Sequence, residues 1–133
     1  GNDIIFANCA SLAGHVTIKD HVILGGFTLV HQFANVGEHS FSARASGIMR
    51  DVPPYVVVAG YSGSPSGINI EGLKRHQFSD AKIRNIKNAY KLLYKSKLKF
   101  DEAMVEIEKL AKGNEEIEVF YSFLSHTERG IVR

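Results

Sequence analysis

The sequence has little cysteine, little proline and no tryptophan: its 133 residues include one Cys and three Pro. The single Cys9 excludes a disulfide within the chain, which fits a reducing compartment, and we expect a cytoplasmic location. No apolar run is long enough to cross a bilayer, no secretory signal peptide opens the sequence, and no membrane insertion is expected. The formal net charge is only +2, so overall charge favours no class of partner.

Charge is unevenly distributed along the chain. Residues 74–99 hold nine Lys or Arg and one acidic residue, whereas residues 101–133 hold four Lys or Arg and eight acidic residues. Within the basic stretch, Arg84, Lys87 and Lys91 recur at helical spacing, opposite apolar positions. Such a stripe either recruits an acidic partner or forms a solvated helix face. No interleaved aromatic pattern favours nucleic acid, which is not the expected partner.

An apolar residue recurs at every sixth position in the first part of the chain, with Ser42 as the one exception. The positions are Phe6, Leu12, Ile18, Leu24, Val30, Val36 and Ile48. A period of six fits neither an α-helix, at about 3.6, nor a plain strand, at about 2, and is typical of hexapeptide parallel β-helices. The fifth residue of each hexad is small or β-branched, which suits an inward-facing corner. Three hexads close one triangular turn in this repeat class, so residues 18 apart are predicted to stack.

The phase of the repeat predicts where the coil begins and ends. The chain opens at the second position of a hexad, so we expect that coils preceding it are missing. Pro53 and Pro54 are predicted to end the repeats, because neither can donate a hydrogen bond to a next strand. Within the repeats, Gly25, Gly26 and Gly37 are expected to ease the corners.

The hydrophobic period changes after the two prolines. Residues 55–59 are predicted to form a strand and residues 60–67 a loop. The fold class is therefore mixed β and α. It has β-helix coils at 1–54, a strand and linker loop at 55–78, and a helical domain at 79–133.

Three helices are predicted in that domain. Ser79 is a good N-cap for the first, and Asp101 is expected to cap a second that Gly113 ends. A third helix is expected from about residue 115 to 125, where apolar residues recur at helical spacing. We expect these helices to pack on one another and on the end of the coil.

Four histidines of the repeats are candidates for chemistry. His15, His21 and His39 share the fourth position of their hexads, and His31 takes the second. They either form a polar line of imidazoles in a groove between subunits or lie exposed on a flat face. Their spacings of 6, 10 and 8 do not match the close histidine pair of zinc-binding hexapeptide trimers, and a metal site needs about three convergent ligands. We therefore expect no metal and no cofactor.

Gly14 and the segment 69–76 are further candidates. The Gly14 amide can approach a ligand closely and donate to a developing oxyanion, or the glycine serves only the backbone angles of a corner. Arg75 can hold a phosphate through two parallel hydrogen bonds. Asn69 and Glu71 alternate on one side of a segment expected to be extended, suited to reading hydroxyls or a base edge. A plain polar linker fits the same residues.

Several strings of the sequence resemble the UDP-N-acetylglucosamine O-acyltransferase family. They are Leu12–Val16, Val30–Phe33, Asp51–Tyr55 and Asn69–Arg75, with further matches at Asn88–Lys91 and Arg129–Arg133. The resemblance covers the whole chain and implies a homotrimer of left-handed parallel β-helices, each followed by a C-terminal helical domain. It also implies transfer of a 3-hydroxyacyl group from acyl carrier protein to the glucosamine 3-hydroxyl of UDP-N-acetylglucosamine, the first step of lipid A synthesis.

The resemblance implies roles for individual residues. Gly14 is similar to the oxyanion donor, His15 to a substrate-sugar contact, and His31 with Gln32 to a pair lining the cleft between subunits. The remaining substrate contacts are Asn69, Glu71, Arg75 and His76, and the acyl carrier protein contacts are Arg84, Lys87 and Lys91. The family's general base is a histidine a few residues before Gly1. None of the six histidines matches it, so the chain by itself is expected to be inactive.

Three positions depart from the family pattern. Ser62 stands where the family often has a histidine, and His76 where it often has a second arginine. Arg44 stands where some members have a glycine that lets a long acyl chain pass, which suggests a shorter acyl group unless Arg44 points to solvent. Two other functions stay open: the sibling N-acyltransferase of the same pathway, and a hexapeptide trimerisation module that binds acyl carrier protein without turnover.

Overall fold

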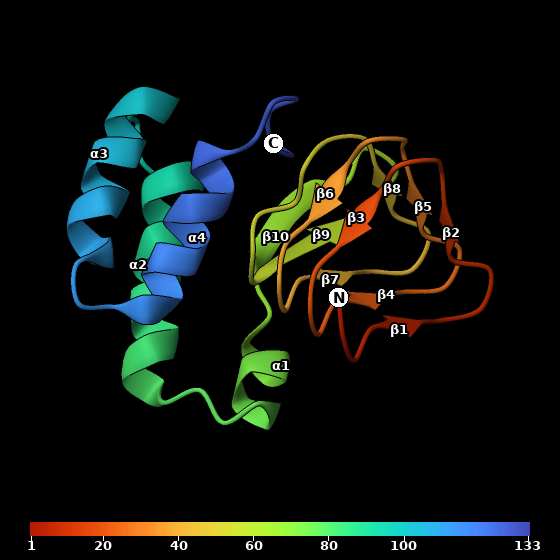
Figure 1. The fold of residues 1–133 in the computed structure, drawn as a ribbon, viewed down its shortest axis with the longest axis horizontal. Coiled ribbons are helices and arrows are strands. Elements are labelled where there is room, and N and C mark those ends of the chain that lie inside the picture. The colour runs from red at the N-terminus through yellow and green to blue at the C-terminus, as the bar shows by residue number, and fades with distance from the viewer.

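The computed structural model describes all residues from 1 to 133 and has two parts, a triangular coil of short strands and a group of helices (Figure 1). The coil strands are β1 Ile5–Phe6, β2 Ser11–Leu12, β3 Thr17–Ile18, β4 Ile23–Leu24, β5 Leu29–Val30, β6 Asn35–Val36, β7 Phe41–Ser42 and β8 Gly47–Ile48. They are followed by β9 Val56–Ala59 and β10 Ser64–Ile68. The helices are α1 Ile70–Arg75, α2 Asp80–Tyr94, α3 Phe100–Ala111 and α4 Glu115–Ser125.

The eight coil strands form three faces, as the hexad period predicts. The faces are β1-β4-β7, β2-β5-β8 and β3-β6, and all of these pairs are parallel. Each strand stacks on the strand 18 residues later, so that Leu12 lies opposite Val30 and Val30 opposite Ile48. Fifth-position side chains such as Val22 and Ala34 are fully buried in the interior. The predicted stacking and the inward-facing corner positions are confirmed.

Each corner of the coil contains a residue with a left-handed backbone, and this residue is never glycine. The fourth hexad positions from Asp3 to Ala45 have φ between 54° and 66°, which costs roughly 1–2 kcal/mol for a residue with a Cβ. The expectation that Gly25 and Gly37 ease corners through their backbone angles is wrong, because neither has a positive φ. A Cβ on Gly25 would lie 2.6 Å from the Ser42 oxygen, and one on Gly37 would lie 2.5 Å from the Pro54 nitrogen. These glycines are required for close stacking of successive turns.

The hexad strands end at β8, before the two prolines, but the sheet itself continues after them. Beyond them, β9 pairs in parallel with β7, with Phe41 opposite Val57. Pro53 and Pro54 occupy the connection before this strand, where no ladder donor is needed, and the Pro53 carbonyl accepts from Ser40 Oγ at 2.9 Å. The predicted loop at 60–67 is also partly wrong, since β10 folds back on β9 as an antiparallel hairpin.

The helical region follows the predicted caps with one correction. Ser79 caps α2, and its hydroxyl accepts from the Lys82 amide at 3.2 Å. Asp101 does not cap α3; it lies in the first turn, and the cap residue is Lys99, whose amide donates to Glu102 Oε1 at 3.0 Å. Helix α4 spans the predicted residues. None of the helices combines the length and apolar character that crossing a membrane requires.

The helices and the coil share one hydrophobic core. Helix α2 packs on β10, α3 and α4, while α3 is the helix farthest from the coil (Figure 1). After α4 the chain returns to the coil, where Ile131 forms a parallel bridge with Asp51. Ile131 and Val132 are buried there, so the C-terminus is part of the core rather than a loose end.

Candidate functional site

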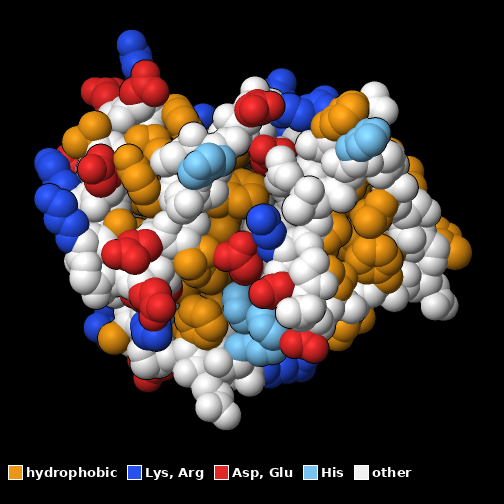
Figure 2. Space-filling model, in the orientation of Figure 1, with side chains coloured by type: hydrophobic (Ala, Val, Ile, Leu, Met, Phe, Trp, Pro, Cys, Tyr) orange, Lys and Arg blue, Asp and Glu red, His pale blue; other side chains and the backbone are white.

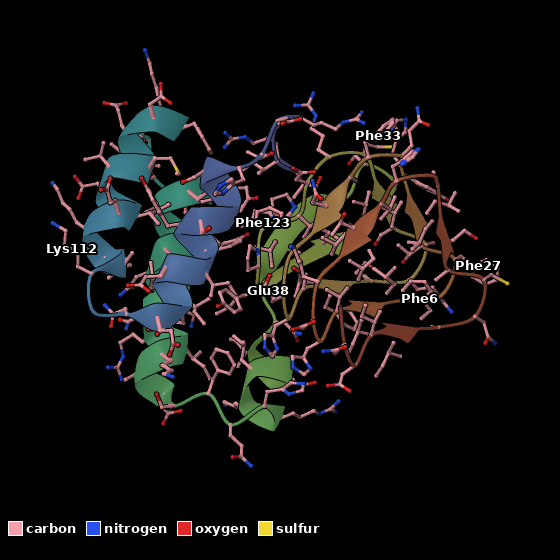
Figure 3. All side chains as sticks on the ribbon, viewed as in Figure 1. Phe6, Phe27, Phe33, Glu38, Lys112 and Phe123 are labelled. Carbon is pink, nitrogen blue, oxygen red and sulfur yellow. The ribbon has the colours of Figure 1, made fainter.

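One corner of the coil collects five candidate or neighbouring residues, and we call it the Gly14 corner: Gly14, His15, His31, Gln32 and Phe33. The His15 and Phe33 rings stack with centroids 4.9 Å apart and planes only 3° from parallel. The Phe33 amide donates to the Gly14 carbonyl at 3.0 Å. Phe33 lies at a corner away from the helices, and the site is open to solvent (Figure 3).

The Gly14 amide has no hydrogen-bond partner within the chain. The same is true of the Gly26 and Gln32 amides, because the third position of a hexad turns its N–H away from the strand ladder. The φ of Gly14 is not positive. Backbone angles therefore do not require glycine here, and the absence of a side chain leaves the amide accessible to a ligand.

His31 is held at this corner by the carbonyl of the next residue. Its Nδ1 lies 3.1 Å from the Gln32 oxygen. The same oxygen accepts a hydrogen bond from Arg129 Nη1 at 2.7 Å. Arg129 lies 97 residues away in sequence and was not singled out by sequence reasoning, because no local pattern connects it to the coil.

A second corner gathers three histidines, and we call it the His39 corner: His21, His39 and His76. Ring centroids are 4.7 Å apart for His21 and His39, 4.3 Å for His21 and His76, and 4.9 Å for His39 and His76. Phe78 contacts the His39 ring edge to face at 5.1 Å. His15, His21 and His39 do not form one line within this chain, since His15 lies on a different corner. The spacing of 18 between His21 and His39 is the signal that places them together.

His39 is the electrostatically unusual residue of the molecule. Only 9% of it is exposed, and its Nδ1 has no hydrogen-bond partner. Burial lowers the pKa of His39 from its ordinary value near 6.5 to about 4, helped by the neighbouring His21 and His76 and opposed by Asp20. The ring is therefore neutral at physiological pH and packs as an aromatic group.

A cavity of about 310 Å³ opens beside the His39 corner, where the coil meets α2 and α4. Acidic side chains border the histidines on this face (Figure 2), among them Glu38 and Glu115 in the cavity wall. Burial raises the pKa of Glu38, and burial also raises that of the nearby Tyr55. The Tyr55 hydroxyl donates to the Glu116 carbonyl at 3.0 Å. These contacts tie the coil to α4.

The segment 69–76 is not extended as expected, because most of it is helix α1. Asn69 is its N-cap: the side-chain oxygen accepts from the Gly72 amide at 3.2 Å, and the side-chain nitrogen donates to the His39 carbonyl at 2.9 Å. Glu71 and Arg75 are exposed on α1 and free to contact a ligand. His76 caps the other end, and its ring belongs to the His39 corner.

The other predicted contacts lie apart from the Gly14 corner within this chain. Arg44 is exposed at the third corner of the coil, beside Phe27, and stacks over Gly26. Arg84, Lys87 and Lys91 are all exposed on α2. Lys91 also borders a groove of about 740 Å³ between α2 and α3.

The outer surface of the coil exposes large apolar side chains. Among them are Phe27, Leu29, Phe33 and Met49, with 59%, 61%, 49% and 53% of each exposed. Phe27 and Phe33 stand at the two corners away from the helices (Figure 3). Exposed apolar residues gathered in this way commonly mark a surface that contacts another protein.

The repeated corners and the attached helices define a hexapeptide-repeat β-helix protein with a small helical domain. A sequence model described as UDP N-acetylglucosamine O-acyltransferase, domain 2, matches residues 51–132. The chain therefore belongs to the UDP-N-acetylglucosamine O-acyltransferase family.

Curated relatives carry the name acyl-[acyl-carrier-protein]–UDP-N-acetylglucosamine O-acyltransferase. The protein from Alkalilimnicola ehrlichii is 48% identical over 133 residues, and that from Burkholderia lata is 42% identical over 137 residues. Both alignments cover 100% of this chain and 52% of the relative. The chain thus spans about half the length of the curated relatives it matches.

Solved structures of UDP-N-acetylglucosamine acyltransferases share the fold. The Francisella novicida structure has a TM-score of 0.94 at 42% identity, covering 98% of this chain and 48% of that one. The Bacteroides fragilis structure has a TM-score of 0.96 at 37% identity, covering 100% and 52%. The predicted fold class, a left-handed parallel β-helix followed by a C-terminal helical domain, is confirmed.

Proposed function

We propose that the whole protein transfers a 3-hydroxyacyl group from acyl carrier protein to the 3-hydroxyl of UDP-N-acetylglucosamine, the first step of lipid A synthesis in the cytoplasm. Family membership supports an acyltransferase of this kind. The observation that carries the proposal is the Gly14 corner, where an unpaired amide lies next to two imidazoles on an open surface.

In the proposed reaction the sugar hydroxyl oxygen attacks the thioester carbon. A C–O bond forms, the C–S bond breaks, and the hydroxyl proton passes through a general base to the thiolate that leaves. The Gly14 N–H stabilises the oxyanion, while His15, His31 and Gln32 hold the sugar and the acyl chain. The base that the family uses matches none of the six histidines, so we expect the 133 residues to need the rest of the protein for activity.

Helix α1 is the proposed nucleotide segment. Arg75 is exposed and suited to hold a phosphate, and Glu71 is exposed on the same short helix. Asn69 acts by fixing α1 to the coil, because the nitrogen and the oxygen of its side-chain amide both make hydrogen bonds within the chain. His76 anchors the far end of α1 in the histidine cluster.

We assign the exposed apolar side chains of the coil to contacts between three copies of the protein. Leu29 belongs to β5 and Met49 follows β8, on the face formed by β2, β5 and β8, and Phe33 stands at the Gly14 corner. A trimer would bury these residues and bring the α1 segment of one subunit toward the Gly14 corner of another. Sedimentation of the whole protein tests this, and a monomer at micromolar concentration would contradict it.

The basic stripe on α2 is the proposed docking site for acyl carrier protein, an acidic partner. Replacing Lys87 and Lys91 by Glu is expected to raise the KM for the acylated carrier protein by at least about tenfold while leaving kcat nearly unchanged. Lys112→Glu is the matched control, because Lys112 is exposed on the side of the helices away from the coil (Figure 3). Equal effects of both changes would contradict a specific docking site.

The direct test is an assay of the whole protein with hydroxyacyl carrier protein and UDP-N-acetylglucosamine. We expect an ester at the sugar 3-hydroxyl, and His15→Asn is expected to lower kcat/KM by about 100-fold, with His126→Asn on α4 as the exposed control. Preferential acylation of an amino-sugar nucleotide would indicate the sibling N-acyltransferase. Binding of the carrier protein without turnover would indicate a non-catalytic trimerisation module.

A further inference from the structure

The last seven residues form a strap that reaches from α4 back to the coil. Its anchor is Asp51, which is 1% exposed. The Asp51 amide donates to the Gly130 carbonyl at 3.1 Å, and the Val132 amide donates to the Asp51 carbonyl at 2.9 Å. The Thr127 hydroxyl donates to Asp51 Oδ2 at 2.7 Å. These contacts hold the backbone on both sides of Arg129, independently of any contact that its own side chain makes.

From this fixed position Arg129 reaches the Gly14 corner. Its Nη1 donates to the Gln32 carbonyl at 2.7 Å, a charge-assisted hydrogen bond. The peptide unit between Gln32 and Phe33 is planar, and its other end, the Phe33 amide, donates to the Gly14 carbonyl at 3.0 Å. One rigid peptide plane is thus held by the strap at one end and by Gly14 at the other.

The same carbonyl determines the state of the His31 ring. Nδ1 of His31 lies 3.1 Å from the Gln32 oxygen, and a carbonyl oxygen can only accept. Nδ1 therefore carries the hydrogen, and Nε2 of the neutral ring is left as an acceptor. A carbonyl has two lone pairs, so Arg129 and His31 can both be accommodated.

We propose that Arg129 is a positioning residue for His31: it fixes the Gln32 carbonyl, which keeps His31 in the Nδ1–H tautomer with Nε2 presented to accept a hydrogen bond from a substrate O–H or N–H. That a substrate donates this hydrogen bond to Nε2 rests on the proposed function, whereas the assignment of the tautomer does not. Without Arg129, water competes for the exposed carbonyl and the ring loses its fixed orientation.

The first experiment is imidazole ¹⁵N NMR of the protein at mildly alkaline pH, with His31 assigned from the spectrum of His31→Asn. The wild-type protein is expected to show a protonated Nδ1 and an unprotonated Nε2. The opposite tautomer in the wild type would overturn the proposal, whether or not any variant folds. Arg129→Gln is expected to move both ¹⁵N shifts toward a mixture of tautomers, and Arg129→Lys to restore part of the wild-type pattern.

Arg133→Gln is the matched control, because it removes the same charge from the same strap without touching the Gln32 carbonyl. Unchanged His31 shifts in Arg129→Gln, or equal changes in Arg133→Gln, would show that the contact does not set the tautomer. In the whole protein we expect Arg129→Gln to lower kcat/KM for the nucleotide sugar about tenfold, the value of one hydrogen bond. Absence of acyltransferase activity in the wild type would refute the proposed function but leave the NMR result standing.

Discussion

The Gly14 corner and the His39 corner are built from the same backbone unit but have opposite environments. In each, a fourth-position residue with a left-handed backbone stacks on the ring 18 residues away, His15 on Phe33 and His21 on His39. The first pair is open to solvent. The second is covered by α1 and faces α4 across an acidic cavity. The repeat supplies the geometry of a corner, and the neighbouring domain decides whether its side chains stay exposed or pack as core.

The largest expected difference between the corners concerns a buried charge. His39→Lys places an ammonium group where burial already opposes protonation, and we expect the free energy of unfolding to fall by about 3 kcal/mol or more. His15→Lys has the same backbone strain but an exposed side chain, so the expected loss is about 1 kcal/mol or less. Urea unfolding of both variants measures this, and similar losses would mean that the corners are not differently covered.

The second expected difference is the pH dependence of stability. The pKa of His39 is about 4 in the folded protein and near 6.5 in the unfolded chain, so the unfolded chain takes up the proton first as pH falls. The contribution of His39 is complete above pH 6.5 and is lost on going down to pH 4, by up to about 3 kcal/mol.

The variant His39→Phe isolates this effect from the carboxylates that titrate in the same range. Its free energy of unfolding is expected to change less between pH 7 and pH 4 than that of the wild type, because the ring that resists protonation is gone. His15→Phe is the control and should retain the wild-type slope. Parallel slopes for all three proteins would show that His39 titrates normally.

The smallest expected difference concerns one glycine from each corner. A Cβ on Gly37, in the His39 corner, would lie 2.5 Å from the Pro54 nitrogen, so Gly37→Ala is expected to cost about 1–3 kcal/mol. Within the 133 residues, a Cβ on Gly14 meets no atom within 4 Å, so Gly14→Ala is expected to change the stability of this chain by about 0.5 kcal/mol or less. Thermal unfolding measures both, and an equal loss would contradict the open geometry at Gly14.

Much of the coil was predictable because its information is local and repeated. The six-residue period placed the strands, and the spacing of 18 gave their partners. The same spacing places His21 next to His39, whereas it gives no signal for His76, which completes the cluster. The continuation of the sheet after the prolines was not predictable in this way, because a proline breaks a ladder only where a donor is required, and Pro53 lies in a connection between strands.

Only part of the candidate site could be predicted, again because the information in the sequence is local. Gly14, His15, His31 and Gln32 lie within two stacked hexads, so the period alone brings them together. Asn69 was expected to face a ligand, yet its side chain caps α1 and contacts the His39 carbonyl. A short polar segment gives no sequence signal for such a contact, since the partner carbonyl lies 30 residues earlier.

The sequence by itself determined the period, the stacking partners, the Ser79 cap of α2 and the family to which the chain belongs. The tertiary structure decided which corner is covered, because His76 at the end of α1 and Phe78 contact His39, whereas His15 stays exposed. It also decided that Arg129 reaches the Gln32 carbonyl from 97 residues away. The local period determines the strands and corners that repeat along the chain. Burial and long-range hydrogen bonds depend instead on where the chain places its last helix and the strap that returns to the coil.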